Sequence, residues 1–227
     1  MITMKKIFLL AITIAIFYGC KESSPEVKDE HTKVTSHYIT NYLVASEIAV
    51  DNKNGTLCLK VSGEEYNTLH EVSEKALELA NLYNDNYCKI GVHPGEAPAL
   101  AYPIEKISIS CDSDFDAEHP AGESLDDIAQ LGFCSFYPFI KNGYKHFSLT
   151  DDWRYGDRVC YTMPFSSVNA DVTKLLWAYF TTSKISPSYV AKIEFTSQPE
   201  KAGEYTFTIE MTTNGETFET TFTHTFE

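Results

Sequence analysis

The sequence predicts a mainly β protein, an antiparallel β-sandwich with one helical insertion. Segments in which polar and apolar residues alternate recur along the chain, and this alternation is typical of strands that are buried on one face. Turn-forming residues separate these segments, as at 51–55 and at Asn214-Gly215. One longer stretch, residues 62–83, has helical spacing instead. An immunoglobulin-like arrangement is one form of sandwich that these features allow.

The first expected element is a β-hairpin. Residues of one parity would form the buried face of its first strand: Tyr38, Thr40, Tyr42, Val44, Ile48 and Val50. Beyond the turn at 51–55, Leu57, Leu59 and Val61 again occupy alternate positions. We therefore expect two antiparallel strands that this turn joins.

Residues 62–83 are expected to form the helix, because their apolar side chains lie three or four positions apart. These side chains are Leu69, Val72, Ala76, Leu79, Ala80 and Tyr83. Ser62 and Glu65 have the spacing of a capping box, in which each side chain bonds the backbone of the other residue. Thr68 and Glu71 have the same spacing and offer a second start.

The middle of the chain is expected to be less regular. Residues Ile104–Cys111 alternate as a strand does, and residues 112–122 form an acidic loop. Residues 124–131 predict two helical turns, whereas residues 132–163 are aromatic and irregular. Residues 169–180 fit a helix by their spacing and a strand by their aromatic and threonine content.

The C-terminal segment predicts a hairpin with a defined register. Asn214-Gly215 suits a two-residue type I′ turn between two alternating segments. That turn would place three pairs opposite each other on one face: Met211 with Phe218, Phe207 with Phe222, and Tyr205 with His224. A strand over residues 189–195 would precede it. Turn chemistry and hydrophobic pattern thus agree on one register.

Residues 1–19 resemble a lipoprotein signal peptide. Lys5 and Lys6 give a positive start, and the apolar run over residues 7–17 follows. This run is shorter than the about 20 residues that span a bilayer, and it fits the apolar region of a secretory signal.

The residues after the run resemble a bacterial lipobox, in which an acylated Cys becomes the mature N-terminus. Gly19 and Cys20 match this motif, whereas Phe17 and Tyr18 depart from its usual Leu and small residue. Cys20 is therefore the expected lipidation site, and residues 20–36 would be a flexible tether before a single domain over 37–227. An ordinary signal peptide or an uncleaved anchor is the alternative.

Composition limits the partners. The net charge of −14 disfavours binding to nucleic acid, so we expect attachment to the outer membrane only through acyl chains, of which more than one is needed for stable anchoring. The sequence does not decide whether the protein lies on the periplasmic or the surface side of this membrane.

Five cysteines follow Cys20, an odd number that leaves at least one thiol without an intramolecular partner. Most of them are expected to be small buried residues. They are Cys58, Cys88, Cys111, Cys134 and Cys160.

Two segments resemble a known group of proteins. Residues 107–125 contain a strand followed by Phe-Asp-Ala-Glu-His-Pro-Ala-Gly, and residues 199–226 contain the terminal hairpin. Together they resemble the uncharacterised small lipoproteins of the Bacteroidetes. This resemblance implies an envelope location and a β fold, and it brings no catalytic residue with it.

An exposed aromatic platform is one candidate binding site. Trp153, Tyr155 and Tyr161 could offer stacking area to a sugar or a peptide at little entropic cost. The alternative is that they pack in the core, which is the commoner fate of such residues between apolar flanks.

A calcium loop is the second candidate site. Asp112, Asp114 and Asp116 take positions 1, 3 and 5 of such a loop, and Glu123 takes position 12. Ala117 stands where the loop normally needs Gly. The alternative, which we favour, is that these acids accept hydrogen bonds from turn amides and from a helix start near residue 124.

No nucleophile elbow, phosphate-binding loop or dinucleotide motif is found, and no cofactor is expected. Cys111 with His119 could form a nucleophile and base, but no protease signature surrounds them. The sequence therefore favours a lipid-anchored envelope protein that binds a partner or plays a structural part. The alternative is a secreted hydrolase that acts on a glycan or peptide with paired acids, such as Asp126 with Asp127.

Overall fold

The structure is a computed structural model that describes residues 34–35, 37–69, 72–87, 89–90, 97–145, 156–178 and 188–227. These residues belong to the second of two units into which the chain divides, Thr32–Glu227. The strands are β1 (Val34–Thr35), β2 (Asn41–Lys53), β3 (Thr56–Asn67), β4 (Lys89–Ile90), β5 (Pro98–Leu100), β6 (Ile104–Cys111), β7 (Ala129–Ser135), β8 (Val159–Pro164), β9 (Ser188–Phe195), β10 (Gly203–Thr213) and β11 (Glu216–Phe226). The helices are α1 (Glu74–Leu82), α2 (Tyr137–Lys141) and the 3₁₀ turn η2 (Phe165–Ser167).

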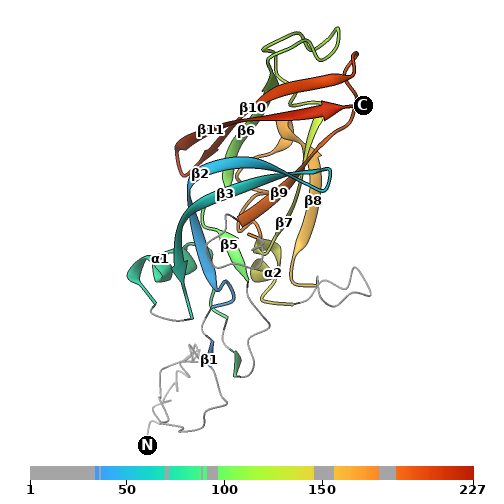
Figure 1. Ribbon diagram of the computed structural model, residues 1–227. Helices are drawn as coiled ribbons and strands as arrows, with labels where there is room; N and C mark the ends of the chain where they lie inside the picture. Colours follow the sequence, from blue (N-terminus) through green and yellow to red (C-terminus); the bar gives the residue numbers. More distant parts are fainter. Residues whose placement is uncertain are drawn as a thin grey trace, which may run out of the picture. The chain divides into compact units, whose positions relative to one another are not determined.

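Two sheets pack face to face and confirm the predicted β-sandwich. The larger sheet has the order β5-β2-β3-β9-β7-β8, and the smaller has the order β11-β10-β6 (Figure 1). All their pairings are antiparallel except that of β2 with β5. The immunoglobulin-like arrangement stays a prediction.

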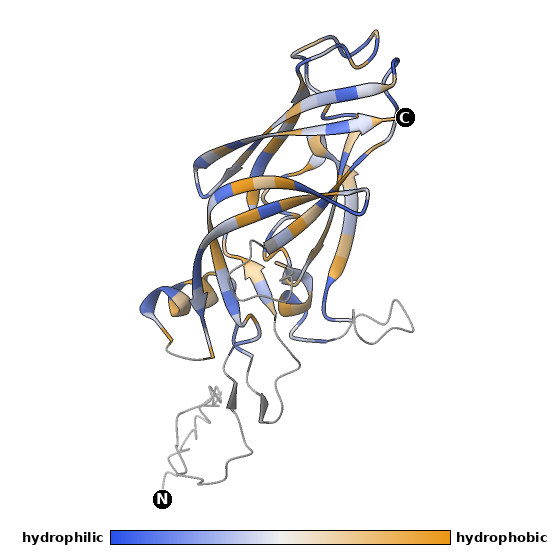
Figure 2. Ribbon diagram, in the orientation of Figure 1, coloured by the Kyte–Doolittle hydropathy of each residue, from blue (hydrophilic) through white to orange (hydrophobic). Residues whose placement is uncertain are grey.

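The core between the sheets is almost entirely hydrocarbon. Its buried members include Leu59, Leu131 and Ile193 from the larger sheet, and Phe207 and Ile209 from the smaller one. Figure 2 shows hydrophobic and hydrophilic bands alternating along the strands, as expected when one face of each strand is buried. Burial of this apolar face is the main force that holds the two sheets together.

The first hairpin is confirmed, but a bulge splits its buried face. The pairing of β2 with β3 shifts at Ser46, where Ala45 lies opposite Gly63 and Glu47 lies opposite Ser62. Before the bulge, Tyr42 contributes to a second hydrophobic cluster. After it, Ile48 belongs to the sandwich core. The alternate residues that the sequence assigned to one buried face therefore pack in two different clusters. The reason is that a bulge moves the side chains that follow it to the other face of the strand.

The helix predicted over residues 62–83 is wrong in its first part. Residues 62–67 continue β3 and pair with the start of β2, so neither expected capping box forms a helix start. The helix α1 begins after Ser73, whose hydroxyl accepts a hydrogen bond from the amide of Ala76 at 3.1 Å. Cross-strand pairing, a long-range contact, has overridden the local helical spacing.

Two further expectations are corrected. Residues 124–131 make one turn, in which the amide of Ala129 donates to the carbonyl of Leu125 at 2.8 Å, and β7 then begins. The described parts of 132–163, residues 132–145 and 156–163, are more regular than expected, since they contain most of β7, all of α2 and most of β8. The described part of 169–180 is neither a helix nor a full strand, and Leu176 and Trp177 form isolated bridges to Ser135 and Ala99.

A second cluster, rich in tyrosine, covers one part of the larger sheet. Residues from α1 and α2 pack there against the beginning of β2 and against β5. The buried carboxylate of Asp85 accepts hydrogen bonds from the amides of Tyr38 and Ile39 at 2.9 Å and from the hydroxyl of Tyr144 at 2.8 Å. These donors compensate the cost of removing a carboxylate from water.

The C-terminal hairpin forms in the predicted register. Tyr205 lies opposite His224, Phe207 opposite Phe222 and Met211 opposite Phe218. Asn214 and Gly215 have φ values of 53° and 73°, as a type I′ turn requires. Phe207 is completely buried, whereas Phe222 is only partly buried and stacks on it with ring centroids 5.2 Å apart.

We expect Gly63→Ala to destabilise the fold by about 3 kcal/mol, because the added Cβ would overlap a backbone atom and the overlap cannot relax through side-chain rotation. A Cβ atom at Gly63 would lie 1.8 Å from the backbone carbonyl oxygen of Val44. Urea unfolding of the variant measures the loss. Unchanged stability would contradict the close approach of β2 and β3 at the bulge.

Candidate functional site

A pocket of about 610 Å³ lies on the larger sheet and is the strongest candidate site. We call it the outer-face pocket, because alternate residues of its strands point away from the sandwich core. Its lining includes Lys53, Cys58, Gly132, Phe133, Cys134, Cys160, Tyr161, Thr162, Trp177, Tyr189, Val190, Ala191, Lys192 and Glu194. Preformed ligand sites commonly have volumes of about 300–1,000 Å³, so the size suits a small ligand.

Four residues form a row across the floor of this pocket. The strand pairings place Cys58 of β3 beside Lys192 of β9, Lys192 beside Gly132 of β7, and Gly132 beside Thr162 of β8. Their neighbours Leu59, Leu131 and Ile193 are buried in the sandwich core. Because side chains alternate along a strand, the four residues of the row project from the opposite face.

Gly132 has no side chain and so leaves a notch in this row. The packing of the neighbouring residues does not require a glycine at this position. A Cβ atom there would meet Thr162 Oγ1 at 3.6 Å and Lys192 Cβ at 3.8 Å, which are ordinary contacts. Its backbone is also outside the left-handed region that favours glycine. Glycine weakens a strand interior and often marks a place where a ligand comes close to the backbone. Gly63, by contrast, is required by the fold.

The pocket is locally positive although the chain is acidic. Lys53 and Lys192 have no carboxylate within ion-pair distance among the described residues. Nearby, Lys60 is already paired with Asp51 at 3.6 Å. One acid, Glu194, also lines the pocket. The free charges of the lining therefore favour an anionic group.

Aromatic rings form part of the wall. Trp177 is held under the guanidinium of Arg158, whose Cζ lies 4.1 Å from the ring centroid, and Arg158 itself pairs with Asp157 at 2.8 Å. The ammonium of Lys53 lies 5.1 Å from the ring centroid of Tyr189. Such contacts restrict the orientation of the rings.

Only one member of the predicted aromatic platform can be placed. Tyr161 lines the outer-face pocket and is half-buried, with its ring centroid 5.5 Å from that of Phe133. Trp153 and Tyr155 lie outside the described residues. Sequence reasoning missed Gly132, Lys192 and Trp177, because no local motif relates these three positions.

The cysteines fall into two groups. Cys134 and Cys160 form a disulfide between paired residues of β7 and β8, and this corrects the expectation that most cysteines are simply buried. Cys58 and Cys111 are free thiols. Burial raises the pKa of both thiols, so at neutral pH they are protonated and poor nucleophiles. Cys88 and Cys20 lie outside the described residues.

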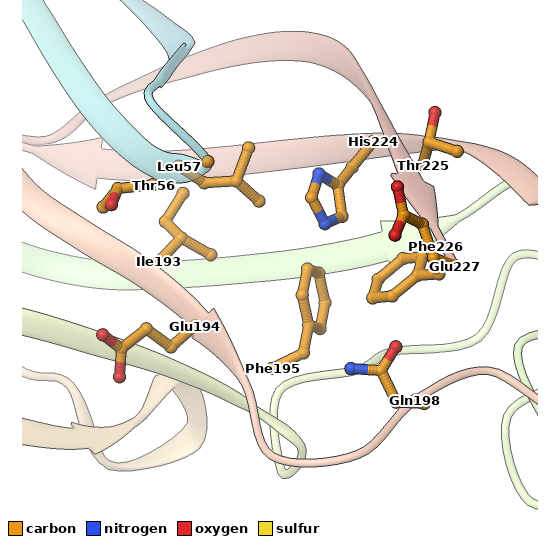
Figure 3. Close-up of a pocket in the computed structure, with 11 residues that line it drawn as sticks. Thr56, Leu57, Ile193, Glu194, Phe195, Gln198, His224, Thr225, Phe226 and Glu227 are labelled. Carbon is orange, nitrogen blue, oxygen red and sulfur yellow. The ribbon is translucent and has the colours of Figure 1, made fainter.

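A second pocket, of about 540 Å³, lies where one end of β9 meets the ends of the hairpins β2–β3 and β10–β11. Figure 3 shows the His224 imidazole and the Phe195 and Phe226 rings gathered at its centre, with Glu194 and Glu227 on opposite sides. The rings of Phe195 and Phe226 lie 5.6 Å apart and continue into the core. This pocket is therefore the end of the sandwich core, with a polar rim.

The acidic loop uses its carboxylates on its own backbone. Asp114 accepts a hydrogen bond from the amide of Ala121, and Asp116 accepts from the amides of Glu118 and His119, each at 2.9 Å. Two further members of the predicted calcium loop are Asp112, which accepts from the Ser113 hydroxyl, and Glu123, which is exposed. Within the described residues, no three metal-ligating side chains gather at one point.

His119 is clamped between two acids. Its Nδ1 lies 2.7 Å from Asp116 Oδ1, and its Nε2 lies 3.2 Å from Asp127 Oδ1. The hydrogen bond with Asp116 raises the pKa of the imidazole, against the opposing effect of burial. With both nitrogens engaged, His119 holds the loop together and is not placed to activate Cys111. Asp126 is also used structurally, since it accepts a hydrogen bond from the amide of Ile109 at 2.7 Å.

Comparisons with known proteins give no assignment: no family model matches, and neither the curated proteins nor the solved structures contain a match. Among the described residues, no helix has the length and apolar character that crossing a membrane requires.

We expect the His119 clamp to stabilise the fold most at acidic pH. Because the folded pKa is raised, the full contribution is present below the unfolded pKa of about 6.5 and is lost as pH rises through the folded value. Urea unfolding should therefore find a larger difference between wild type and His119→Gln near pH 5.5 than near pH 8.5.

His224 provides the matched control, because burial lowers its pKa. Its neutral form is favoured in the folded state, so stability falls as pH drops below about 6.5. The pH trend of the difference between wild type and His224→Gln should have the opposite sign. Equal differences for His119→Gln at both pH values would contradict the clamp.

Proposed function

We propose that this chain is a lipid-anchored protein of the bacterial outer membrane that binds a small ligand and does not transform it. The anchor would be acyl chains on Cys20, as the lipobox-like residues indicate. Kinship with the small lipoproteins of the Bacteroidetes is part of this proposal and is supported by the Phe-Asp-x-x-His-Pro-Ala-Gly loop.

The notch at Gly132 is the observation that carries the binding role. It lies in a preformed pocket, on a rigid sheet, between Lys192 and Thr162. A glycine costs a strand about 0.5–1 kcal/mol relative to alanine, and here no steric requirement accounts for that cost. Close approach of a ligand to the sheet would account for it.

The disulfide supports an extracytoplasmic location. Cys134 and Cys160 are both accessible to solvent at least in part, and β8 is an edge strand. Disulfides of this kind persist in oxidising compartments such as the periplasm or the cell surface, and they are rare in the cytosol.

Several groups that a hydrolase would need are committed elsewhere. Asp116 and Asp127 hold His119, Asp126 holds the backbone of Ile109, and the Cys58 thiol is protonated at neutral pH. A nucleophile with its base, or an acid with a free partner, is what hydrolysis demands. These arrangements favour binding over catalysis.

If Cys20 is lipidated, the variant Cys20→Ala should lose its membrane anchor. The variant cannot be acylated, so it should leave the membrane fraction or accumulate as an unprocessed precursor. Fractionation followed by mass measurement of the N-terminal region reads both outcomes. Cys58→Ala is the matched control and should fractionate as wild type. If Cys20→Ala also did so, with unchanged processing, the anchor would be wrong.

The binding role predicts that Gly132→Ala stabilises the fold. Without steric conflict, alanine should raise the free energy of unfolding by about 0.5–1 kcal/mol. Urea unfolding measures the change, and Gly63→Ala, whose Cβ would lie 1.8 Å from the carbonyl oxygen of Val44, should change the stability in the opposite direction. A clear loss of stability in Gly132→Ala would make this glycine structural and would remove the support for binding.

A further inference from the structure

We propose that the outer-face pocket binds a carboxylate carried on a sugar ring, that is, a uronic acid unit of an acidic glycan. The inference rests on the proposed function and names the class of its ligand. It depends on the juxtaposition of two lysines, the Gly132 notch and the aromatic wall in one cavity.

Lys53 and Lys192 favour a ligand that carries a negative charge. Near the pocket, Lys60 and Arg158 each pair with a carboxylate. Lys53 and Lys192 line the pocket without a carboxylate in ion-pair distance among the described residues. A ligand carboxylate would supply the missing partner, and the exposure of both lysines makes the attraction sensitive to salt.

The charge balance favours one negative charge over two. Glu194 lines the same pocket as Lys53 and Lys192, so the lining carries one more positive than negative charge. A carboxylate matches this balance, whereas a doubly charged phosphate would be repelled by Glu194. Lysine contacts such a group as a point charge, with no requirement for a forked geometry.

The Gly132 notch and the aromatic rings favour a ligand in which a flat ring carries the charged group. A ring that lies over Gly132 can approach the backbone, because no side chain projects from the sheet at that position. Thr162 borders the notch with a hydroxyl that can bond a sugar hydroxyl. Trp177 and Tyr189 contribute aromatic surface to the wall, against which the C–H face of a sugar ring can pack.

Calorimetric titration of the full chain in detergent tests the proposal. The probes are galacturonate and glucuronate oligosaccharides, each paired with its methyl ester, which keeps the rings and removes the charge. We expect saturable binding of at least one acid, weaker by about tenfold for its ester and reduced at higher salt.

The variants locate the site. Gly132→Ala should weaken binding about tenfold while it preserves or raises stability, and Lys192→Gln should weaken it about fivefold. Lys106→Gln is the matched control, because Lys106 is an exposed lysine on the smaller sheet, and its affinity should stay at the wild-type value.

The proposal would be overturned by no saturable binding of either acid, by equal binding of acid and ester, or by binding that Gly132→Ala and Lys192→Gln leave unchanged. Displacement of the sugar by inorganic phosphate at equal concentration would also overturn it. If both acids fail while Gly132→Ala stabilises the fold and Cys20→Ala leaves the membrane, the ligand class is wrong and the anchored binding protein stands.

Discussion

The close contact between Gly63 and the carbonyl of Val44 lets one strand serve two cores. At this bulge β2 shifts its register against β3, so Tyr42 packs under the helices while Ile48 packs between the sheets. The helical layer is thereby confined to the part of the larger sheet formed by β5 and the start of β2. The outer-face pocket forms on β3, β9, β7 and β8, where none of the described helices lines it.

The two cores are held together differently. The core between the sheets is hydrocarbon, so its stability follows from buried apolar area. The helical layer is built from tyrosines around Asp85, whose carboxylate accepts bonds from two backbone amides and from the hydroxyl of Tyr144. Hydrogen bonds are directional, so this carboxylate fixes how the segment after α1 lies against the start of β2. Removal of one donor would leave a buried charge poorly compensated.

What the sequence could predict was local. The register of β10 with β11 follows from Asn214-Gly215 and from alternation on both sides of it, and all of that information lies within the hairpin. The bulge at Ser46 and the strand pairing of residues 62–67 depend on contacts across the sheet, so spacing alone predicted a helix there. The candidate site is harder still. Gly132 and Lys192 become neighbours only because β7 pairs with β9, and no short motif encodes that pairing.

Strand β8 is the last strand of the larger sheet on its side, and the disulfide from Cys160 to Cys134 ties it to β7. Ladder contacts and the packing of Tyr161 on Phe133 also keep β8 in place, but the disulfide is its covalent link to β7, and loss of β8 would expose the edge of β7. An edge with free amides and carbonyls, next to apolar residues such as Leu131 and Phe133, is a template for strands of other molecules. The disulfide therefore adds a covalent restraint that keeps this edge paired, and we expect reduction of the bond to favour self-association.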